Sequence, residues 1–281
     1  MRAPKVWIDG VLVPVDEARV SPFDHGLLVG DGVFETLRVY GGIPFAWRRH
    51  AERLEHSAEG LGLTVPDRAT LRRAADAVLG ANGLREARLR ITVTGGPAPL
   101  GSERGKSGPT VIVAASDARS WPATERVVTV PWPRNERGAT AGMKTISYAE
   151  NVRALAYAHA RGASEALFLN TVGEVCEATG SNVFLVVEET VLTPPAESGC
   201  LLGVTRALVL ELCEDLGIPR AVRPIPPDAL GEAGEAFLTS STREVQPISH
   251  FDDLALPKAP GPTTARLADE FSALVARDPD P

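Results

Sequence analysis

Lys144 is one of only four lysines among the 29 lysine and arginine residues of this chain. The segment GMKTISYAENVRALAYAHARGA (142–163) places it between Met143 and Ile146, before a stretch with the pattern of an amphipathic helix. Because an amine can lose its proton and condense with a carbonyl group, whereas a guanidinium cannot, this lysine is a candidate for imine chemistry. An ordinary surface lysine at a strand end is the alternative.

Three other polar clusters lie far from Lys144 in the sequence. Glu177, in GEVCEATGSNVF (173–184), precedes a turn of small residues that leads into an apolar strand. Gly203 and Thr205 stand at the start of a predicted helix, where unpaired N–H groups and the helix dipole favour an anion such as phosphate. A serine- and threonine-rich turn follows in LTSSTREV (238–245). Each cluster alone also fits an ordinary solvated turn or helix start.

Composition limits the classes of protein that fit this chain. It has 281 residues, 44% of them hydrophobic and 23% charged, with a net charge of −7, which is typical of a soluble globular protein. The acidic balance and the lack of a basic block argue against nucleic acid, and no apolar run is long enough for a membrane helix. Three cysteines without metal-ligand spacing indicate a reduced, cytoplasmic protein with no metal site.

Local patterns predict a mixed α/β chain with two domains. A hairpin is expected around Asp9-Gly10 and another around Gly41-Gly42. Helices are expected at 48–62, 67–82, after Lys144, at 203–218 and near the end of the chain, where a frayed tail follows. Strands are expected at 88–94, 110–115, 127–130, 166–170, 183–187 and 191–193. Strands and helices mix in both parts, which favours mixed over purely parallel sheets.

Domain boundaries follow from the same patterns. The expected division is a smaller N-terminal domain (1–117), a linker (118–126) and a larger C-terminal domain (127–281). The loop Gly95–Pro109, GGPAPLGSERGKSGP, is too polar and too rich in glycine and proline for a core element. Loops of that length inside a domain often serve function.

The order of the motifs resembles one family over almost the whole chain, from Trp7 to Ile248. The motifs that carry the resemblance are WIDG, DHGLLVGDGVFETLRVY, HAERL, MKTISYAEN, EATGSNVF, LLGVTRA and TSSTREVQPI. They resemble the fold type IV pyridoxal-phosphate enzymes, which include branched-chain and D-amino acid aminotransferases and 4-amino-4-deoxychorismate lyase. The resemblance implies a two-domain α/β fold and pyridoxal 5'-phosphate (PLP) as cofactor.

This resemblance implies a role for each polar cluster. Lys144 matches the lysine that joins the cofactor as an imine and then moves a proton between substrate and cofactor. Glu177 matches the carboxylate that keeps the pyridine nitrogen protonated, so that the ring can withdraw electrons. Residues that match the phosphate-binding set are Arg53, Val204, Thr205, Ser241 and Thr242. Tyr148 matches the tyrosine that hydrogen-bonds the ring hydroxyl in the branched-chain subgroup, and Asn182 supports the turn beneath the ring.

Family relatives assemble the active site at a homodimer interface, so at least a dimer is expected, with the loop Gly95–Pro109 reaching toward the pocket of the partner. The usual D-amino acid aminotransferases hold the substrate carboxylate with an arginine and a histidine, which by spacing would fall near Ala98 and Leu100, where neither occurs. Arg90 is the best replacement by alignment, and Arg88 lies on the same strand face. The remaining candidates for the substrate site are Arg38, Arg104 and Arg243.

Transfer of an amino group between an amino acid and a 2-oxo acid, such as 2-oxoglutarate or pyruvate, is the activity that the resemblance favours. The GDGVFE strand and the length resemble the D-amino acid and lyase branches more than the branched-chain enzymes, whose tyrosine and glycine are replaced here by Val29 and Thr36. Among these branches, D-amino acid transamination is favoured. Deoxychorismate lyase and branched-chain aminotransferase are the alternative enzymes. A relative that only binds the cofactor is the alternative of a different class, and the retained Lys144 and Glu177 argue against it.

Overall fold

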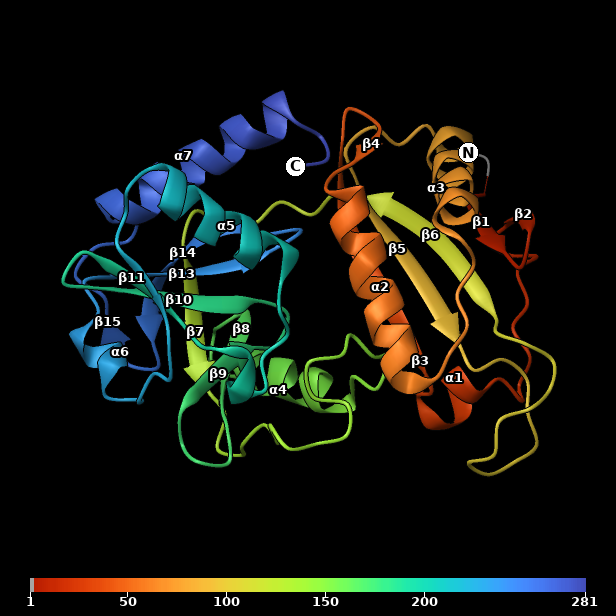
Figure 1. Cartoon of the computed structure of the whole chain (residues 1–281), viewed down its shortest axis with the longest axis horizontal. Helices are drawn as coiled ribbons and strands as arrows, with labels where there is room; N and C mark the ends of the chain where they lie inside the picture. The colour runs from red at the N-terminus through yellow and green to blue at the C-terminus, as the bar shows by residue number, and fades with distance from the viewer. Residues whose placement is uncertain (1–2) are drawn as a thin grey trace. The chain divides into compact units, whose positions relative to one another are not determined.

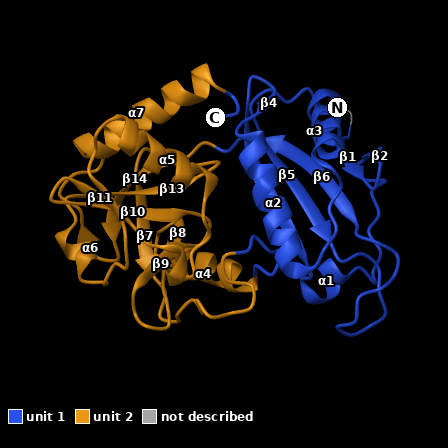
Figure 2. Cartoon of the chain, viewed as in Figure 1, with its two compact units in different colours: residues 1–119, 143–148, 279–281 blue, residues 120–142, 149–278 orange. Residues whose placement is uncertain are grey.

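A computed structural model describes residues 3–281 of the chain. The chain divides into two compact units, shown in blue and orange in Figure 2. Unit 1 comprises residues 1–119, 143–148 and 279–281, and unit 2 comprises residues 120–142 and 149–278. The sequence-based division into two contiguous domains differs from this one in the lysine segment 143–148 and the last three residues, which both belong with the N-terminal unit.

Unit 1 is built on a six-stranded antiparallel sheet within its described residues, with strand order β2-β1-β6-β5-β3-β4 (Figure 1). The two predicted hairpins, β1–β2 and β3–β4, lie at the two opposite edges of this sheet. The strands are β1 (Lys5–Ile8), β2 (Val11–Pro14), β3 (Gly32–Tyr40), β4 (Ile43–Pro44), β5 (Ala87–Thr94) and β6 (Val111–Asp117).

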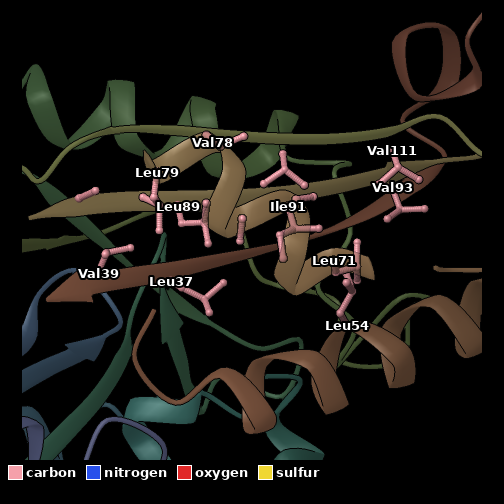
Figure 3. Packing of buried hydrophobic residues seen from close by; sticks show 14 of the residues in the cluster. Leu37, Val39, Leu54, Leu71, Val78, Leu79, Leu89, Ile91, Val93 and Val111 are labelled. Atoms are coloured by element: carbon pink, nitrogen blue, oxygen red, sulfur yellow. The ribbon is translucent and has the colours of Figure 1, made fainter. Parts of the chain in front are cut away.

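One face of this sheet forms the core of unit 1 with two helices. Leu37, Leu89 and Ile91 alternate along the strands and are buried against α2 (Trp47–Leu61) and α3 (Arg68–Asn82). Leu54 of α2 and Val78 of α3 contribute to the same cluster (Figure 3). Burial of the apolar face, worth about 25 cal/mol per Å², is what attaches the helices to the sheet. The short helix α1 (His25–Val29) precedes β3.

The opposite face of the same sheet carries polar and aromatic residues. In the register of β3 and β5, Phe34 lies opposite Thr92, Thr36 opposite Arg90, and Arg38 opposite Arg88. The prediction that Arg88 and Arg90 share a face is confirmed, because side chains alternate along a strand. By the same rule, the side chains of Glu35 and Arg38 point to opposite faces of the sheet, although the two residues lie close together in the sequence.

Unit 2 contains a nine-stranded mixed sheet among its described residues, with the order β12-β11-β10-β13-β14-β7-β8-β9 and β15 paired to β14 (Figure 1). The pairs β11–β12, β14–β7 and β7–β8 are parallel and the others antiparallel. The expected mixed sheet is therefore confirmed in unit 2, whereas the sheet of unit 1 is antiparallel throughout. The strands are β7 (Glu125–Thr129), β8 (Glu165–Leu169), β9 (Val175–Ala178), β10 (Asn182–Val187), β11 (Thr190–Thr193), β12 (Arg220–Val222), β13 (Glu235–Ser240), β14 (Glu244–Phe251) and β15 (Leu254–Ala255).

Three helices of this unit lie close to the positions that the sequence predicts: α4 (Ala149–His159), α5 (Val204–Asp215) and α7 (Pro262–Arg277). The short 3-10 helix η1 (Ala196–Ser198) and the four-residue helix α6 (Ala229–Glu232) were not predicted. Within residues 3–281, no helix has the length and apolar character needed to span a bilayer. The same residues contain no group of three or more histidine, cysteine, aspartate or glutamate side chains placed to hold a metal ion.

The sequence predicts a frayed tail after α7, and this prediction is wrong. Residues 279–281 belong to unit 1 and make hydrogen bonds with the start of α2. The tail is polar and has no periodic pattern, so only a long-range contact could order it.

Candidate active site

The Lys144 segment runs along the first residues of β3. The Phe34 amide donates to the Lys144 carbonyl at 3.0 Å, and the Ile146 amide donates to the Gly32 carbonyl at 2.9 Å. The Lys144 amide donates to Ser57 Oγ of α2 at 3.0 Å. The main chain of Lys144 is therefore fixed by both a strand and a helix of unit 1.

Gly32 makes this close pairing of strands feasible. A Cβ atom at this position would lie 2.7 Å from the Val93 carbonyl oxygen and 2.8 Å from Ile146 Cδ1. Since real Cβ atoms do not approach other atoms so closely, a larger residue at Gly32 would displace either β5 or the lysine segment.

Phe34 gathers three of the predicted site residues around its ring. Lys144 Nζ lies 4.4 Å from the ring centroid, Arg90 Cζ lies 3.7 Å from it, and the Tyr148 ring packs edge-on at 5.2 Å. The Phe34 side chain itself is buried. Cations are attracted to the face of an aromatic ring, so one phenylalanine places an amine, a guanidinium and a phenol close together.

The environment of Arg90 affects its acidity. Burial lowers the pKa of the Arg90 guanidinium, and the Arg88 charge acts in the same direction, whereas Tyr148 opposes both. Arginine remains protonated in proteins despite such shifts. Arg90 Nε also donates to Thr92 Oγ1 at 3.1 Å, which orients the group on this face.

Beneath the other face of β3, Glu35 joins two residues of α2. Arg53 donates from Nε to Glu35 Oε1 at 2.7 Å and from Nη2 to Oε2 at 2.8 Å, and His50 Nδ1 lies 2.7 Å from Oε2. Glu35 and His50 are both buried. This bidentate contact fixes the orientation of the Arg53 guanidinium.

The protonation states of this cluster follow from burial and from the neighbouring charges. Burial alone would raise the pKa of Glu35, but the charges of Arg53 and His50 and their hydrogen bonds hold it well below its usual range. Burial is the largest effect on His50 and lowers its pKa, with Arg53 and Lys144 acting in the same direction and Glu35 opposing them. At neutral pH we therefore assign an ionised Glu35 and a neutral His50 that donates its Nδ1 hydrogen to the carboxylate.

In unit 2, the Glu177 carboxylate is held from two directions. The Leu201 amide donates to Oε2 at 2.9 Å, and Arg134 Nη2 lies 4.0 Å from Oε1. Arg134 also pairs with Glu150 at 3.2 Å and lies over the Phe168 ring at 4.1 Å. A cation and an amide donor thus both face the Glu177 carboxylate.

The start of α5 presents main-chain donors next to Asn182. Gly203 is the N-cap of α5, and no side chain caps this end of the helix. Val204 and Thr205 are the first two residues of the helix. Asn182 Nδ2 donates to the Leu201 carbonyl at 2.7 Å. A Cβ atom at Gly203 would lie only 2.2 Å from Asn182 Oδ1, so this approach requires glycine.

The turn between β13 and β14 contains Ser241 and Thr242. The Thr242 carbonyl accepts from Trp121 Nε1 at 2.7 Å, which anchors the turn to the segment before β7. Thr239 pairs with Asn182 across the β10–β13 ladder. The hydroxyls of Thr239 and Ser181 are buried and have no hydrogen-bond partner within residues 3–281. Buried hydroxyls that lack a hydrogen-bond partner and lie near a helix N-terminus are suited to an anionic or polar ligand.

Three of the four other candidate arginines already have carboxylate partners. Arg243 is buried between Glu125 at 3.1 Å and Glu165 at 2.8 Å. Arg38 pairs with Glu86 at 3.1 Å. Arg104 makes a bidentate contact with Asp31, with distances of 2.6 and 2.8 Å, and thereby fastens the loop after β5 to the start of β3. Arg88 is exposed and lies across from Arg38.

Residues 32–251 match the family model described as amino-transferase class IV. The chain belongs to this family. Class IV aminotransferases use pyridoxal 5'-phosphate, which agrees with the cofactor expected from the sequence.

Relatives within the class carry several activities. A protein provisionally named branched-chain-amino-acid aminotransferase, from Methanocaldococcus jannaschii, is 34% identical over 95% of each chain. D-alanine aminotransferase of Bacillus licheniformis is 31% identical over 94% of each chain. Aminodeoxychorismate lyase of Bacillus subtilis is 30% identical over 93% of this chain and 92% of its own.

Solved structures of similar proteins confirm the fold. The branched-chain aminotransferase of Thermoproteus uzoniensis with norvaline has a TM-score of 0.90 and 32% identity, over 96% of this chain and 94% of its own. The branched-chain amino acid aminotransferase of Escherichia coli has a TM-score of 0.92 and 27% identity, over 97% of this chain and 95% of its own. The predicted fold type IV architecture is therefore correct.

A class IV aminotransferase needs an amine, an anion site and a carboxylate for its cofactor, and this chain has groups that fit each need. Lys144 offers the amine in unit 1. The uncapped start of α5 and the two orphan hydroxyls suit a phosphate, and Glu177 suits a protonated ring nitrogen. Sequence reasoning missed three contributors: Phe34, His50 and Arg134. Each is an ordinary residue in its local pattern, and only its contacts distinguish it.

Proposed function

We propose that this class IV aminotransferase moves an amino group between an amino acid, with D-amino acids favoured, and a 2-oxo acid such as 2-oxoglutarate or pyruvate. The observation that carries the proposal is the placement of Lys144 and Arg90 on one ring, that of Phe34. Transamination of amino acids needs a basic amine near the substrate Cα and a cation for its carboxylate. These two residues provide both within one unit.

Two sets of residues hold the cofactor in this proposal. Its phosphate is bound by Arg53, by the first amides of α5 at Val204 and Thr205, and by the hydroxyls of Ser241 and Thr242. Its ring is bound by Glu177 at the nitrogen and by Tyr148 at the hydroxyl, with Asn182 supporting the loop before α5. When bound, the cofactor would supply the electron withdrawal from the substrate Cα, and Lys144 would take and return the proton there.

Arg90 is our choice for the substrate carboxylate. It lies on Phe34 beside Lys144, and it donates to a threonine hydroxyl rather than to a carboxylate. Arg88, two residues earlier on the same face, is the second choice. Arg38 and Arg243 are less suited, since Glu86 in the first case and Glu125 and Glu165 in the second already balance their charge.

The preference for D-amino acids rests on sequence details and on one group of relatives. Val29 and Thr36 replace residues of the branched-chain pattern, and D-alanine aminotransferases are among the relatives. A branched-chain L-amino acid aminotransferase is the second candidate, supported by the 34% identical relative and by the solved structures.

Adding separate D- and L-amino acids to the yellow holoenzyme tests the proposal. D-amino acids are expected to bleach the visible absorbance of the bound cofactor, with release of the matching 2-oxo acid. Bleaching by L-leucine or L-valine alone would establish the second candidate. Release of pyruvate from aminodeoxychorismate, without any transamination, would establish a lyase instead.

Arg90→Ala is expected to raise KM for amino acids and 2-oxo acids while the affinity for the cofactor is unchanged. A charge-assisted bond to a carboxylate is worth about 1.5–3 kcal/mol, or roughly ten- to a hundredfold in kcat/KM. Primary amines without a carboxylate should react as before. Matched changes, Arg243→Ala and Arg104→Ala, serve as controls, and an effect confined to Arg243→Ala would move the carboxylate site to the β13–β14 turn.

Glu177→Gln is expected to retain the cofactor but to slow removal of the Cα proton, because a neutral amide does not keep the ring nitrogen protonated. The loss of a charge-assisted hydrogen bond predicts a decrease of roughly ten- to a hundredfold in the single-turnover rate. Glu174→Gln is the control, because it makes the same carboxylate-to-amide change in the same hairpin. Glu174 accepts a hydrogen bond from Asn170 at 3.4 Å. An unchanged rate in Glu177→Gln would remove this carboxylate from the chemistry.

A homodimer is part of the proposal, with an apolar surface of unit 1 as its interface. Phe23, Leu27, Val29 and Leu100 are exposed, and the Ala98 amide donates to the Phe23 carbonyl, so the loop after β5 adjoins α1. Exposed apolar side chains gathered in one place are typical of interfaces. Light scattering should give twice the monomer mass for the wild type, and Leu27→Glu should reduce it, whereas the exposed Leu254→Glu should not. A monomeric wild type with full activity would contradict this.

A further inference from the structure

The described residues after α7 bind the N-terminal turn of α2. The Ala46 amide donates to the Pro279 carbonyl at 2.8 Å, and the Arg48 amide donates to Asp280 Oδ1 at 2.9 Å. Arg49 Nε donates to the main-chain oxygen of Pro281 at 2.7 Å. All these residues belong to unit 1.

The start of α2 lacks the local groups that usually stabilise a helix N-terminus. Its N-cap is Ala46, which has a left-handed φ of 52° and no side chain that can accept a hydrogen bond. The first turn contains Arg48 and Arg49 and no acidic residue, although acidic residues are favoured there by the helix dipole. Asp280 therefore supplies from a distant segment the acceptor and the negative charge that the helix lacks.

α2 carries the groups that orient the cofactor-binding side of unit 1. His50 and Arg53 follow the capped turn and hold Glu35, and Ser57 accepts the hydrogen bond of the Lys144 amide. If the first turn of α2 opened, the contact of His50 with Glu35 would be lost first, and the bidentate contact of Arg53 with Glu35 would be lost next. The order of the first turn and the orientation of Arg53 are thus linked through one helix.

We propose that residues 279–281 act as a capping clip for α2, and that Asp280 is a positioning residue for Arg53. The inference rests on the proposed binding of the cofactor phosphate by Arg53. In this role Asp280 acts on Arg53 through the order of α2. Because Asp280 is exposed, added salt weakens its electrostatic contribution but leaves its hydrogen bond.

Amide hydrogen exchange tests the clip without reference to the cofactor. Loss of a helix cap changes a local opening equilibrium by roughly fivefold. Asp280→Ala is expected to reduce the protection of the Arg48 amide by about this factor, and Asp280→Asn, which keeps the acceptor, to restore it. Asp269→Ala, on the exposed side of α7, is the charge-matched control. Unchanged protection in Asp280→Ala, or an equal loss in the control, would overturn the clip.

Binding of pyridoxal 5'-phosphate and of pyridoxal, which lacks the phosphate, tests the link to Arg53. Asp280→Ala is expected to weaken binding of the phosphorylated form by at most about fivefold, the factor reached when the opened turn is the major state, and to leave pyridoxal binding unchanged, with recovery in Asp280→Asn. Equal weakening of both forms would indicate a general loss of structure and overturn the positioning role.

Arg53→Ala separates this inference from the proposed function. If Arg53→Ala leaves the affinity for pyridoxal 5'-phosphate unchanged, the proposed phosphate role of Arg53 is wrong, and the positioning role is wrong with it. If Arg53→Ala weakens binding but Asp280→Ala does not, the phosphate role stands and the clip has no positioning role.

Discussion

Replacement of Lys144 by alanine is expected to abolish transamination and the colour of the bound cofactor while the fold is retained. Lys144 is the amine that lies on Phe34 beside Arg90, and a proton acceptor positioned in this way contributes about 10²–10⁴-fold to a rate. In the proposed function Lys144 also carries the covalent link to the cofactor, and the loss of that link would add to this effect. Stopped-flow absorbance and a coupled 2-oxo acid assay measure both losses.

Exposed lysines provide matched controls for this experiment. Lys106→Ala and Lys258→Ala remove solvent-exposed amines and should leave activity and colour unchanged. Circular dichroism of Lys144→Ala should match that of the wild type, because both backbone contacts of Lys144 are made by main-chain atoms that alanine keeps. A borohydride-stable adduct of the cofactor on another lysine of the Lys144→Ala variant would refute the assignment.

Glu35→Gln is expected to lower the free energy of unfolding by about 3–5 kcal/mol, the usual cost of removing one partner of a buried ion pair. The change leaves Arg53, whose side chain is 12% exposed, without its carboxylate. Glu86→Gln removes the partner of Arg38 in a pair whose carboxylate is 57% exposed, and should cost at most about 1 kcal/mol. Urea denaturation of the two variants compares the buried and exposed pairs directly, and equal losses would show that burial of Glu35 is unimportant.

The pH dependence of unfolding provides a second measure of the same cluster. The pKa of Glu35 is held below its usual 4.5 in the folded state, so its stabilising contribution is present above that pH and is lost as pH falls. The pKa of His50 is also lowered, from 6.5, so the folded state loses stability as pH falls below that value, in the same direction. In Glu35→Gln the carboxylate contribution disappears, and the His50 contribution grows because the charge that opposed it is gone. The variant should therefore lose more stability than the wild type between about pH 6.5 and 5, and less below about pH 4.5.

Much of the fold could be predicted because its signals are local. The turn at Asp9-Gly10, the alternation in β5 and the apolar stripe of α5 each follow from the geometry of one element. The same alternation is enough to place Arg88 and Arg90 on one face. The family followed from the ordered motifs around Lys144, Glu177 and the start of α5, since chemistry ties particular residue types to these positions.

Local rules also explain the elements that the sequence does not predict. α1, β12 and α6 contain five residues or fewer, which is too short for a periodic pattern to stand out. At β9 the sequence indicates only the approach to a turn, because Glu177 interrupts its apolar residues. Its strand character comes from pairing with β8, which is a tertiary contact.

The sequence by itself determined the residue types that the chemistry requires, because a motif is a local and ordered set of side chains. Only the tertiary structure decided their neighbours. It placed Phe34 beneath Lys144 and Arg90, joined Glu35 to His50 and Arg53, and brought Asp280 to the start of α2. It also enclosed Arg243 between two carboxylates, where the sequence showed only an arginine beside a polar turn. The physical reason is that burial and ion pairing depend on residues far apart in the chain, and a periodic pattern carries no information about which distant segment will meet it.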